Sequence, residues 1–398
     1  MSSLIRRLNS LRQDLWRAAR GQGQKATVQH YAQAAGRRQP PPQPVALATT
    51  AMRVTAVTHE TPSAISLTLV RQDGADIEFL PGMFFTLVLN IAGREHRRAY
   101  SISSAATLRT SATITIKRVP DGLVSQHLVD TVAVGASLNV LGPAGAFTLR
   151  PQAGRQRELL LIGGGSGITP LMAILRSVLA IEADSRITLF YANRRRDEII
   201  FADELDALVR QYRPRLRLLH VLEEAPAAWS GACGRLDVEQ CTRLLTQAYG
   251  EDLPADLRVF QCGPAPMMEA VRTSLLAQGL AAEHLQQENF LPGRREQALA
   301  DSVAQPLTII AADGQRWQGY AAAGQSLLDA GLALQAPMNF SCTLGGCGRC
   351  RVRVLSGSVA MPGPHGLLPE EEEAGYALAC IATASSPLTI AIAPPTPL

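Results

Sequence analysis

The hydrophobic and polar positions of this 398-residue chain follow three successive patterns, the first of which starts near residue 51. Up to about residue 150, short β-rich runs are separated by Gly, Pro and Asp, which predicts strands of a small antiparallel β-barrel. From residue 159, apolar strands alternate with helical segments such as Asp203–Gln211, which predicts a parallel α/β sheet. After residue 305, two strands and a helix at Ser326–Leu334 lead into a cysteine-rich loop and predict a third domain.

These patterns indicate a multidomain chain. The predicted strands include Arg53–Val57, Ala64–Leu69, Phe84–Leu89, Ala112–Ile116, Arg186–Tyr191, Leu307–Ile310 and Arg316–Ala321. The expected boundaries are 1–50 for a basic extension with a Pro-rich linker, 51–151 for the barrel, 152–290 for the α/β domain, 291–304 for a linker and 305–398 for the last domain.

The charge is distributed unevenly along the chain. The formal net charge is +4, yet residues 1–44 contain eight Lys and Arg against one acid, so this segment carries +7 and the remainder carries −3. Because the net positive charge is confined to one end, an evenly basic nucleic-acid-binding protein is not expected, and we predict no nucleic-acid partner.

The basic segment has helical periodicity. Its leucines recur at helical spacing with arginines on the other side, at Leu4, Leu8, Leu11, Leu15, Arg6, Arg17 and Arg20. Residues 3–20 are therefore predicted to form a cationic amphipathic helix. Three interpretations remain open: a mitochondrial transit peptide, a disordered tail, and a docking helix for an anionic membrane or an acidic patch on a partner.

Two uncharged stretches, 159–175 and 374–398, are interrupted by Gly or Pro and are too broken to span a bilayer. The cysteines outside the C-terminal motif, Cys233, Cys241 and Cys262, suggest no disulfide framework. We therefore expect a reducing, cytoplasmic compartment, with peripheral membrane contact through residues 3–20 as a further hypothesis.

The C-terminal cysteines carry the most specific chemical signal. Cys342, Cys347 and Cys350 are spaced C-x4-C-x2-C, and Cys380 follows after 29 residues, which is typical of a plant-type 2Fe-2S cluster. Glycines between the first three allow the loop to curl tightly around the irons. Structural zinc is the alternative, but zinc sites favour two paired ligand arms, and here the fourth cysteine stands alone.

Two further regions suggest phosphate binding. The apolar strand Leu159–Ile162 runs into Gly163-Gly164-Gly165-Ser166-Gly167-Ile168-Thr169-Pro170 and then a helix, and unpaired N–H groups at such a helix start favour an anion. A clear ribose-binding acid about 20 residues on is missing, so this is not the standard dinucleotide fingerprint. In the barrel, Arg98 can bind phosphate, Tyr100 can stack on a flat ring and Ser125 can cap a pyrophosphate; a surface arginine and a core tyrosine are the alternatives.

Four motifs, taken together and in order, resemble the ferredoxin-NADP reductase superfamily. They are Arg98-x-Tyr100-Ser101, Gly122-x-x-Ser125, Gly165-x-Gly167-x-x-Pro170 and Cys262-Gly263-Pro264-Ala265-Pro266-Met267-Met268. With the cysteine motif C-terminal to them, the chain resembles single-component oxygenase reductases. The run Arg97–Ile102, with Lys117 and Arg118, most resembles phenylacetyl-CoA epoxidase reductases and fatty-acid-desaturase reductases. The resemblance implies an FAD-binding barrel, an NAD(P)-binding α/β domain and a β-grasp ferredoxin domain.

The resemblance also implies residue roles. Arg98 would hold flavin phosphate, Tyr100 would lie against the isoalloxazine and Ser101 would reach flavin N5. Cys262 would sit by the nicotinamide C4, which makes Ser101 and Cys262 the expected catalytic residues; a reactive thiol nucleophile is the alternative for Cys262. The other expected cofactor-binding residues are Gly122, Ser125, Gly165, Gly167, Thr169, Pro170, Gly263, Pro264 and Met267.

The expected function is an NAD(P)H-dependent oxidoreductase that passes electrons through FAD and its own 2Fe-2S cluster to a separate oxygenase, hydroxylase or desaturase. FAD is favoured over FMN because Ser125 suits a cofactor with a pyrophosphate. A reductase for a non-oxygenase acceptor, such as a hybrid-cluster protein, and a redox sensor without fast turnover are the alternatives. For the nicotinamide, Arg194–Arg196 suit a 2′-phosphate whereas Glu223 and Glu224 would repel it, which favours NADH slightly.

Overall fold

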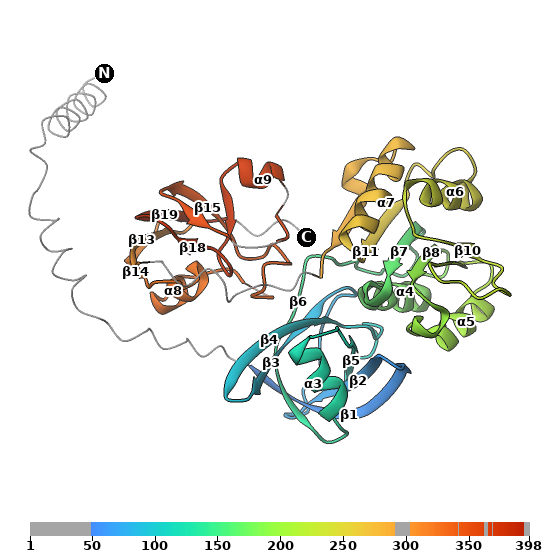
Figure 1. Ribbon diagram of the computed structural model, residues 1–398, viewed down its shortest axis with the longest axis horizontal. Helices are drawn as coiled ribbons and strands as arrows, with labels where there is room; N and C mark the ends of the chain where they lie inside the picture. The colour runs from blue at the N-terminus through green and yellow to red at the C-terminus, as the bar shows by residue number, and fades with distance from the viewer. Residues whose placement is uncertain (1–48, 291–302, 341, 362–364, 368, 394–398) are drawn as a thin grey trace, which may run out of the picture. The chain divides into compact units, whose positions relative to one another are not determined.

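The computed structural model describes residues 49–290, 303–340, 342–361, 365–367 and 369–393, coloured along the chain in Figure 1. The predicted helix at residues 3–20 and most of the predicted linker at 291–304 lie outside the described residues. Among the helices of these described ranges, none combines the length and the hydropathy of a membrane-spanning segment.

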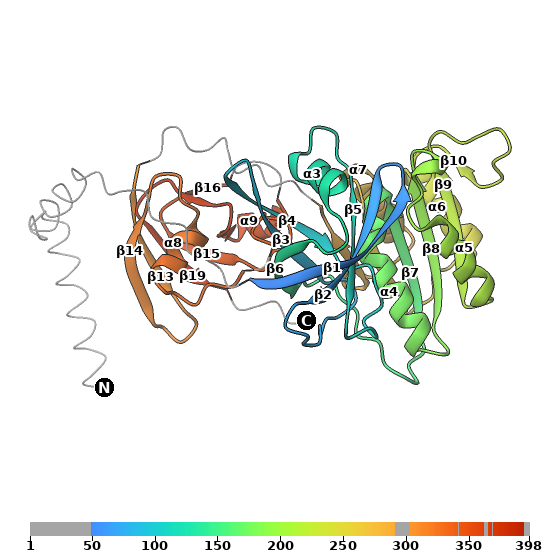
Figure 2. The same ribbon diagram turned by 90° about the horizontal axis from the view of Figure 1, so that it is seen from below.

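The first sheet is antiparallel, as predicted, and its strands are easiest to follow in Figure 2. Its strand order is β4-β3-β6-β1-β2-β5, and an antiparallel bridge between Ile102 and Ile114 joins the end of β4 to β5, which closes the sheet into a barrel. The elements are β1 (Thr50–Thr61), β2 (Ala64–Arg71), β3 (Phe84–Ile91), β4 (Arg94–Ser101), β5 (Ala112–Lys117), α3 (Leu123–Thr131) and β6 (Ser137–Ala144).

The second sheet is parallel, in the order β10-β9-β8-β7-β11-β12. Helices α4 and α5 cover one face and α6 and α7 the other (Figure 1). The elements are β7 (Glu158–Gly164), η1 (Gly165–Gly167), α4 (Ile168–Ile181), β8 (Arg186–Asn193), η2 (Arg196–Glu198), α5 (Ala202–Gln211), β9 (Leu216–Leu222), β10 (Ala232–Cys233), α6 (Val238–Tyr249), β11 (Arg258–Cys262), α7 (Ala265–Ala277), η3 (Ala282–His284) and β12 (Leu285–Glu288).

Helix α4 is buried on almost every side because two domains enclose it. Its sequence ITPLMAILRSVLAI has no polar stripe, which is typical of a helix without a solvent face. One side packs on the parallel sheet, and its hydrophobic core also includes Ala64, Phe147 and Leu149 from the barrel region. The ring of Phe147 meets that of Phe260 edge to face at 5.5 Å. The two domains therefore share a continuous apolar core.

The third sheet has five strands in the order β14-β13-β19-β15-β17. Strands β13 and β19 are parallel and the other pairs are antiparallel, with α8 packed into the same core, which agrees with the predicted β-grasp fold. The elements are β13 (Gln305–Ile310), β14 (Arg316–Ala321), α8 (Leu327–Ala333), β15 (Arg351–Ser356), β16 (Val359–Ala360), α9 (Pro369–Glu373), β17 (Tyr376–Leu378), β18 (Thr383–Ala384) and β19 (Leu388–Ile392).

Candidate functional site

The parallel sheet reverses its strand order at β7. Strand β7 pairs with β8 on one side and with β11 on the other, so the chain moves outward in both directions from this point. Open parallel sheets bind ligands in the crevice outside the carboxyl ends of the strands at such a reversal. The turn Gly165–Gly167 follows β7 and the turn Gly263–Pro264 follows β11. The two glycine motifs predicted from sequence therefore meet at the position expected of a nucleotide site.

Steric contact explains why these positions are glycines. A Cβ on Gly167 would lie 2.0 Å from the carbonyl oxygen of Cys262, which is a prohibitive overlap. A Cβ on Gly164 would lie 2.7 Å from Pro264 Cδ, and one on Gly263 would lie 2.5 Å from Met267 Cε. Each turn can approach the other only because the side chains are missing, so the backbone N–H groups remain accessible at this edge.

The glycine turn is held in an anion-binding shape. Gly165 adopts φ +52°, and the Thr169 hydroxyl donates to the Ser166 carbonyl at 2.9 Å. Pro170 lies in the first turn of α4, where its missing N–H has no cost. The Tyr191 hydroxyl, fully buried, donates to the Gly165 carbonyl at 3.1 Å. The N-terminus of α4 therefore presents N–H groups and the positive end of its dipole to a phosphate.

A lysine from the barrel approaches the same turn. Lys117, at the end of β5, has its Nζ 3.8 Å from where a Cβ on Gly165 would lie, and it forms an ion pair of 2.9 Å with Glu198. Both side chains are about one-quarter exposed. A cation at this position favours a bound phosphate, and sequence reasoning assigned no role to Lys117 because a lysine at a strand end resembles any surface residue.

Cys262 lies at the end of β11 and has no exposed surface. Burial raises its thiol pKa well above the ordinary value, and the neighbouring Glu288 carboxylate raises it further. The thiol therefore stays protonated at neutral pH and is a poor nucleophile. This geometry disfavours the alternative interpretation of Cys262 as a reactive nucleophile.

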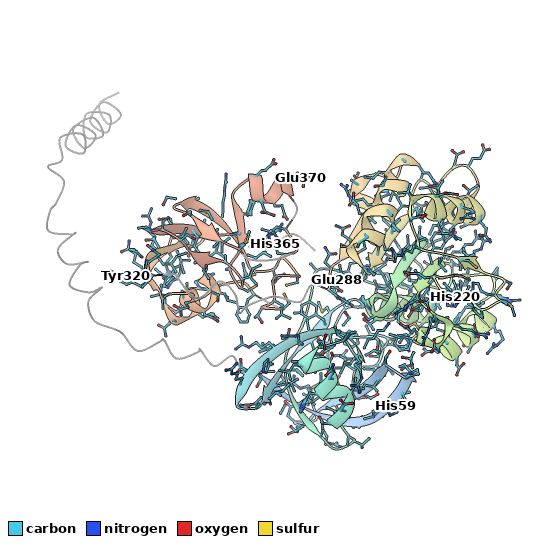
Figure 3. All side chains as sticks on the ribbon, viewed as in Figure 1. His59, His220, Glu288, Tyr320, His365 and Glu370 are labelled. Atoms are coloured by element: carbon cyan, nitrogen blue, oxygen red, sulfur yellow. The ribbon has the colours of Figure 1, made fainter. Side chains whose placement is uncertain are left out.

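Glu288, labelled in Figure 3, pairs in register with Cys262 across β11 and β12. Its Oε2 is buried and has no hydrogen-bond partner within the described residues. Burial and, to a smaller extent, the nearby Cys342 thiolate raise the carboxyl pKa to about 8. A protonated carboxyl group therefore lies close to Cys262, the thiol predicted to lie beside the nicotinamide, and to Cys342, a predicted cluster ligand.

Strand β4 brings together the three predicted flavin residues. Arg98 and Tyr100 pair with Leu87 and Phe85 on β3, and because strand side chains alternate, both project from the same face. Burial raises the Tyr100 pKa, and the charge of Arg98 opposes that rise, which shows that the two groups are close. Ser101, at the end of the strand, is 3% exposed. The strand therefore suits a flavin, with the flavin ring against Tyr100 and a flavin phosphate at Arg98.

Ser125 lies in the first turn of α3 and bonds back to the turn that precedes this helix. Its hydroxyl accepts from the Val119 N–H at 3.0 Å and donates to the Gly122 carbonyl at 3.1 Å. A Cβ on Gly122 would lie 2.7 Å from that hydroxyl, which explains the glycine. Ser125 thus shapes the turn, and the N–H groups at the start of α3 are the natural donors for a pyrophosphate.

The four predicted cluster cysteines form two pairs. Cys347 lies close enough to Cys342, and Cys350 close enough to Cys380, to shift the thiol pKa of that partner. Within the described residues, no three His, Cys, Asp or Glu side chains converge as ligands of a single ion would. Two thiols for each of two irons is the ligand arrangement of a 2Fe-2S cluster, whereas structural zinc needs all four ligands on one ion. The residues fit the cluster better than zinc.

The loop geometry also suits a cluster. Gly345 and Gly348 adopt φ values of +82° and +69°, which turn the chain around the thiols. The Leu344 N–H donates to Cys342 Sγ at 3.4 Å. The Cys347 thiol and backbone N–H groups together lower the Cys342 pKa to about 6, so this sulfur is prepared to act as a thiolate ligand.

Comparison with known families supports this three-part arrangement. The family model described as an oxidoreductase FAD-binding domain matches residues 51–149, and an oxidoreductase NAD-binding domain matches residues 161–273. A 2Fe-2S iron-sulfur cluster binding domain matches residues 310–385.

Among similar proteins, one of the subunits of the 1,2-phenylacetyl-CoA epoxidase of Escherichia coli (strain K12) is 33% identical over 334 residues, covering 83% of this chain and 93% of that protein. The ferredoxin reductase component of the 3-ketosteroid-9-alpha-monooxygenase of Rhodococcus rhodochrous is 33% identical over 341 residues, with 83% and 92% covered. The structure of phthalate dioxygenase reductase covers 86% of this chain and 98% of its own, with 20% identity and a TM-score of 0.58, and supports the fold alone.

Proposed function

Because this chain belongs to the family of oxidoreductases that join FAD-binding, NAD-binding and 2Fe-2S domains as oxygenase reductase components, we propose that it supplies electrons to a terminal oxygenase, hydroxylase or desaturase. The observation that carries the proposal is that four thiols form two pairs in a domain that follows the two nucleotide-binding domains along the chain. When bound, a flavin exchanges electrons singly or in pairs, which links a two-electron nicotinamide to a one-electron cluster.

The proposed residue roles follow the geometry. Arg98 binds flavin phosphate, Tyr100 supports the flavin ring and Ser101 contacts its reactive edge. The N-terminus of α4 binds nicotinamide phosphate, with Thr169 holding the turn. Cys262 lines the nicotinamide position as a neutral thiol, in keeping with its burial.

The proposed electron donor is NADH. At the carboxyl ends of β8 and β9, Arg194 is already paired with Glu224 at 2.6 Å, and Arg235 lies 3.4 Å from Glu223. The Glu224 N–H also donates to the Arg194 carbonyl at 2.8 Å, which ties the two loops together. An arginine neutralised in this way attracts a 2′-phosphate weakly, and the two carboxylates repel it.

Cytochrome c reduction by the purified holoprotein tests the proposal. NADH should drive rapid, continuous reduction, and the reduced protein should show the electron paramagnetic resonance signal of a 2Fe-2S cluster. A cluster that is reduced once without sustained turnover would instead indicate a redox sensor. Purification of the terminal acceptor by co-precipitation would identify the partner, and a hybrid-cluster protein in that role would reject the oxygenase assignment.

The basic segment at residues 3–20 is proposed to dock the reductase on an anionic membrane. Its support is the sequence pattern of leucines and arginines, since each Lys or Arg near an anionic surface contributes about 1 kcal/mol. Deletion of residues 1–44 should remove salt-sensitive binding to phosphatidylserine vesicles and leave cytochrome c reduction unchanged. Equal sedimentation of the intact and truncated proteins with vesicles at low salt would reject membrane docking.

A further inference from the structure

Helix α4 connects the nucleotide-binding turn to the flavin domain. Its first residues form the phosphate-facing N-terminus, and Arg176 and Ser177 in its second half bond to the segment that follows β4. We propose that Arg176 and Ser177 form an interdomain lock that fixes the position of the nicotinamide site relative to strand β4. This inference rests on the proposed function, because it concerns how the two cofactor domains are aligned for electron transfer.

Arg176 uses each of its guanidinium nitrogens. Nε donates to Glu204 Oε1 at 2.7 Å, Nη2 donates to Glu204 Oε2, and Nη1 donates to the Ser103 carbonyl of the flavin domain. The guanidinium carbon also lies 5.0 Å from the centre of the Phe201 ring. Because a rigid, planar group makes all these contacts at once, a lysine cannot replace them. Arg176 thus holds one flavin-domain carbonyl in a fixed direction.

Phe201 adopts an unusual backbone conformation at this point. Its φ is +63°, a region that bulky residues avoid, and it is the N-cap residue of α5. Its ring is buried in the core shared with α4 while it supports the Arg176 guanidinium. Strain of this kind persists only where surrounding contacts impose it. The strained residue indicates that the position of Arg176 is tightly determined.

Ser177 supplies the second contact. It has no exposed surface, and its hydroxyl accepts from the Ala106 N–H of the flavin domain at 3.0 Å. A serine inside a helix more often bonds the carbonyl one turn earlier, so this outward bond is a specific use of the side chain. Ala106 lies five residues after Ser101, the last residue of β4. The bond therefore links α4 to the chain that leaves the flavin strand.

The rest of the interface contains an ion pair, Lys117 with Glu198 at 2.9 Å, and apolar contacts. Ala64, Phe147 and Leu149 pack on the nucleotide domain through apolar contacts, which have no preferred direction. Beside the lock, a cavity of about 590 Å³ separates the domains, lined by Glu60 and Ser66 on the barrel side and by Glu204 on the other. With apolar contacts on one side and a cavity on the other, the directional bonds of Arg176 and Ser177, together with the Lys117–Glu198 ion pair, oppose a small sliding motion.

The expected consequence is kinetic, because displacement by about 1 Å at a reacting centre can slow a reaction on the order of a hundredfold. Arg176→Met and Ser177→Ala each remove one contact across the interface. Arg215→Met is the matched control, because Arg215 also donates to backbone carbonyls and lies 5.7 Å from an aromatic ring, Tyr212, but its contacts stay within the nucleotide domain.

The test uses the FAD-loaded full chain and three measurements. These are the limiting rate of flavin bleaching at saturating NADH, the Kd for NAD⁺ by calorimetry, and hydrogen exchange of the peptide containing Ala106. For Arg176→Met we expect a rate about tenfold lower or more, an unchanged Kd and faster exchange. Ser177→Ala should show the same pattern with a smaller rate change, about threefold. Arg176→Lys should resemble the methionine variant, and Arg215→Met should resemble the unmodified protein.

Two outcomes would contradict the proposal that Arg176 and Ser177 form an interdomain lock. One is an unchanged limiting rate in Ser177→Ala, which keeps every charge, together with unchanged exchange at Ala106. The other is a rate loss matched by a weaker NAD⁺ affinity, which would indicate damage to the phosphate end of α4 instead. If the unmodified protein is not bleached by NADH or NADPH, the proposed function fails, whereas the exchange comparison still decides whether the lock exists.

Discussion

The glycine turn after β7 and the cysteine loop after α8 are both short and glycine-rich, yet we propose that they hold their ligands with different parts of the chain. In the glycine turn, backbone N–H groups face the ligand, and a Cβ on Gly167 would lie 2.0 Å from a carbonyl oxygen. In the cysteine loop, side-chain thiols face the ligand, and Gly345 and Gly348 only turn the chain, with φ of +82° and +69°. The first loop requires missing side chains and the second requires four specific ones.

This difference predicts opposite sensitivities. Adding a methyl group should damage the glycine turn, where two distant motifs are in backbone contact, and should be tolerated in the cysteine loop where the space is open. Exchanging the sulfur of one cysteine for oxygen should damage the cysteine loop, because a thiolate is a metal ligand that a hydroxyl group does not replace.

The largest effect is expected from Cys347→Ser. Loss of one thiolate should prevent cluster assembly while leaving the two nucleotide-binding domains folded, since the core of the cysteine-containing domain is separate from theirs. Cytochrome c reduction by NADH should fall to background, and ferricyanide reduction, which the flavin can support directly, should persist. Cys233→Ser, at an exposed thiol outside the loop, is the control. Equal loss of both activities would show that the modules do not act in series.

Gly167→Ala is expected to have the next largest effect. The new Cβ overlaps the Cys262 carbonyl, so one of the two turns must move, at a cost of about 1–3 kcal/mol in the free energy of unfolding. The affinity for NAD⁺ should fall as well, because the backbone N–H groups of the glycine turn move when the turn moves. Gly346→Ala is the matched change in the cysteine loop, where the Cβ would lie 3.2 Å from the Asn289 carbonyl and needs only a small adjustment. Urea unfolding and NAD⁺ calorimetry measure both, and a similar loss in the two variants would contradict the contrast.

Much of this architecture was predictable because its strands carry a periodic pattern. The predicted strands at Ala64–Leu69 and Arg186–Tyr191 and the helix at Asp203–Gln211 lie inside β2, β8 and α5. Two-residue strands such as β10 were not predicted, since two positions carry no period.

The residues of the candidate site also fall into two groups, those that the sequence could identify and those that it could not. Cysteines and clustered glycines reveal their chemistry by residue type alone, so they were identified from sequence. Tyr191 and Arg176 were not, because a tyrosine in an apolar strand and an arginine in a helix are typical of ordinary core and surface positions. Their roles depend on hydrogen bonds to Gly165 and Ser103, which only tertiary structure creates.

A smaller change is expected for nicotinamide choice. The unmodified protein should prefer NADH over NADPH by about tenfold or more in kcat/KM, which is about 1.4 kcal/mol. Glu223→Ser combined with Glu224→Arg removes two carboxylates and frees Arg194 from its ion pair, so the preference should shift towards NADPH. Asp73→Asn, which releases Arg71 at an ion pair in the barrel, is the control. A native preference for NADPH would reverse the assignment of these loops.

The smallest effect concerns the pH dependence of stability at Glu288. Because burial raises its folded pKa to about 8, the folded protein holds a proton that the unfolded chain loses near the ordinary carboxyl pKa of 4.5. Its contribution to stability is therefore fully present at acidic pH and is lost as pH rises through about 8.

Glu288→Gln resembles the protonated carboxyl group at every pH. Relative to the unmodified protein, the variant should therefore gain stability as pH rises from about 7 to about 9, by an amount on the order of 1 kcal/mol. Urea unfolding of the holoprotein at both pH values measures this gain. Glu283→Gln, at an exposed carboxyl group just before β12, is the control and should show no such trend. If the stability difference between Glu288→Gln and the unmodified protein is the same at both pH values, the pKa of Glu288 lies in its ordinary range. The claim that burial raises this pKa would then be wrong.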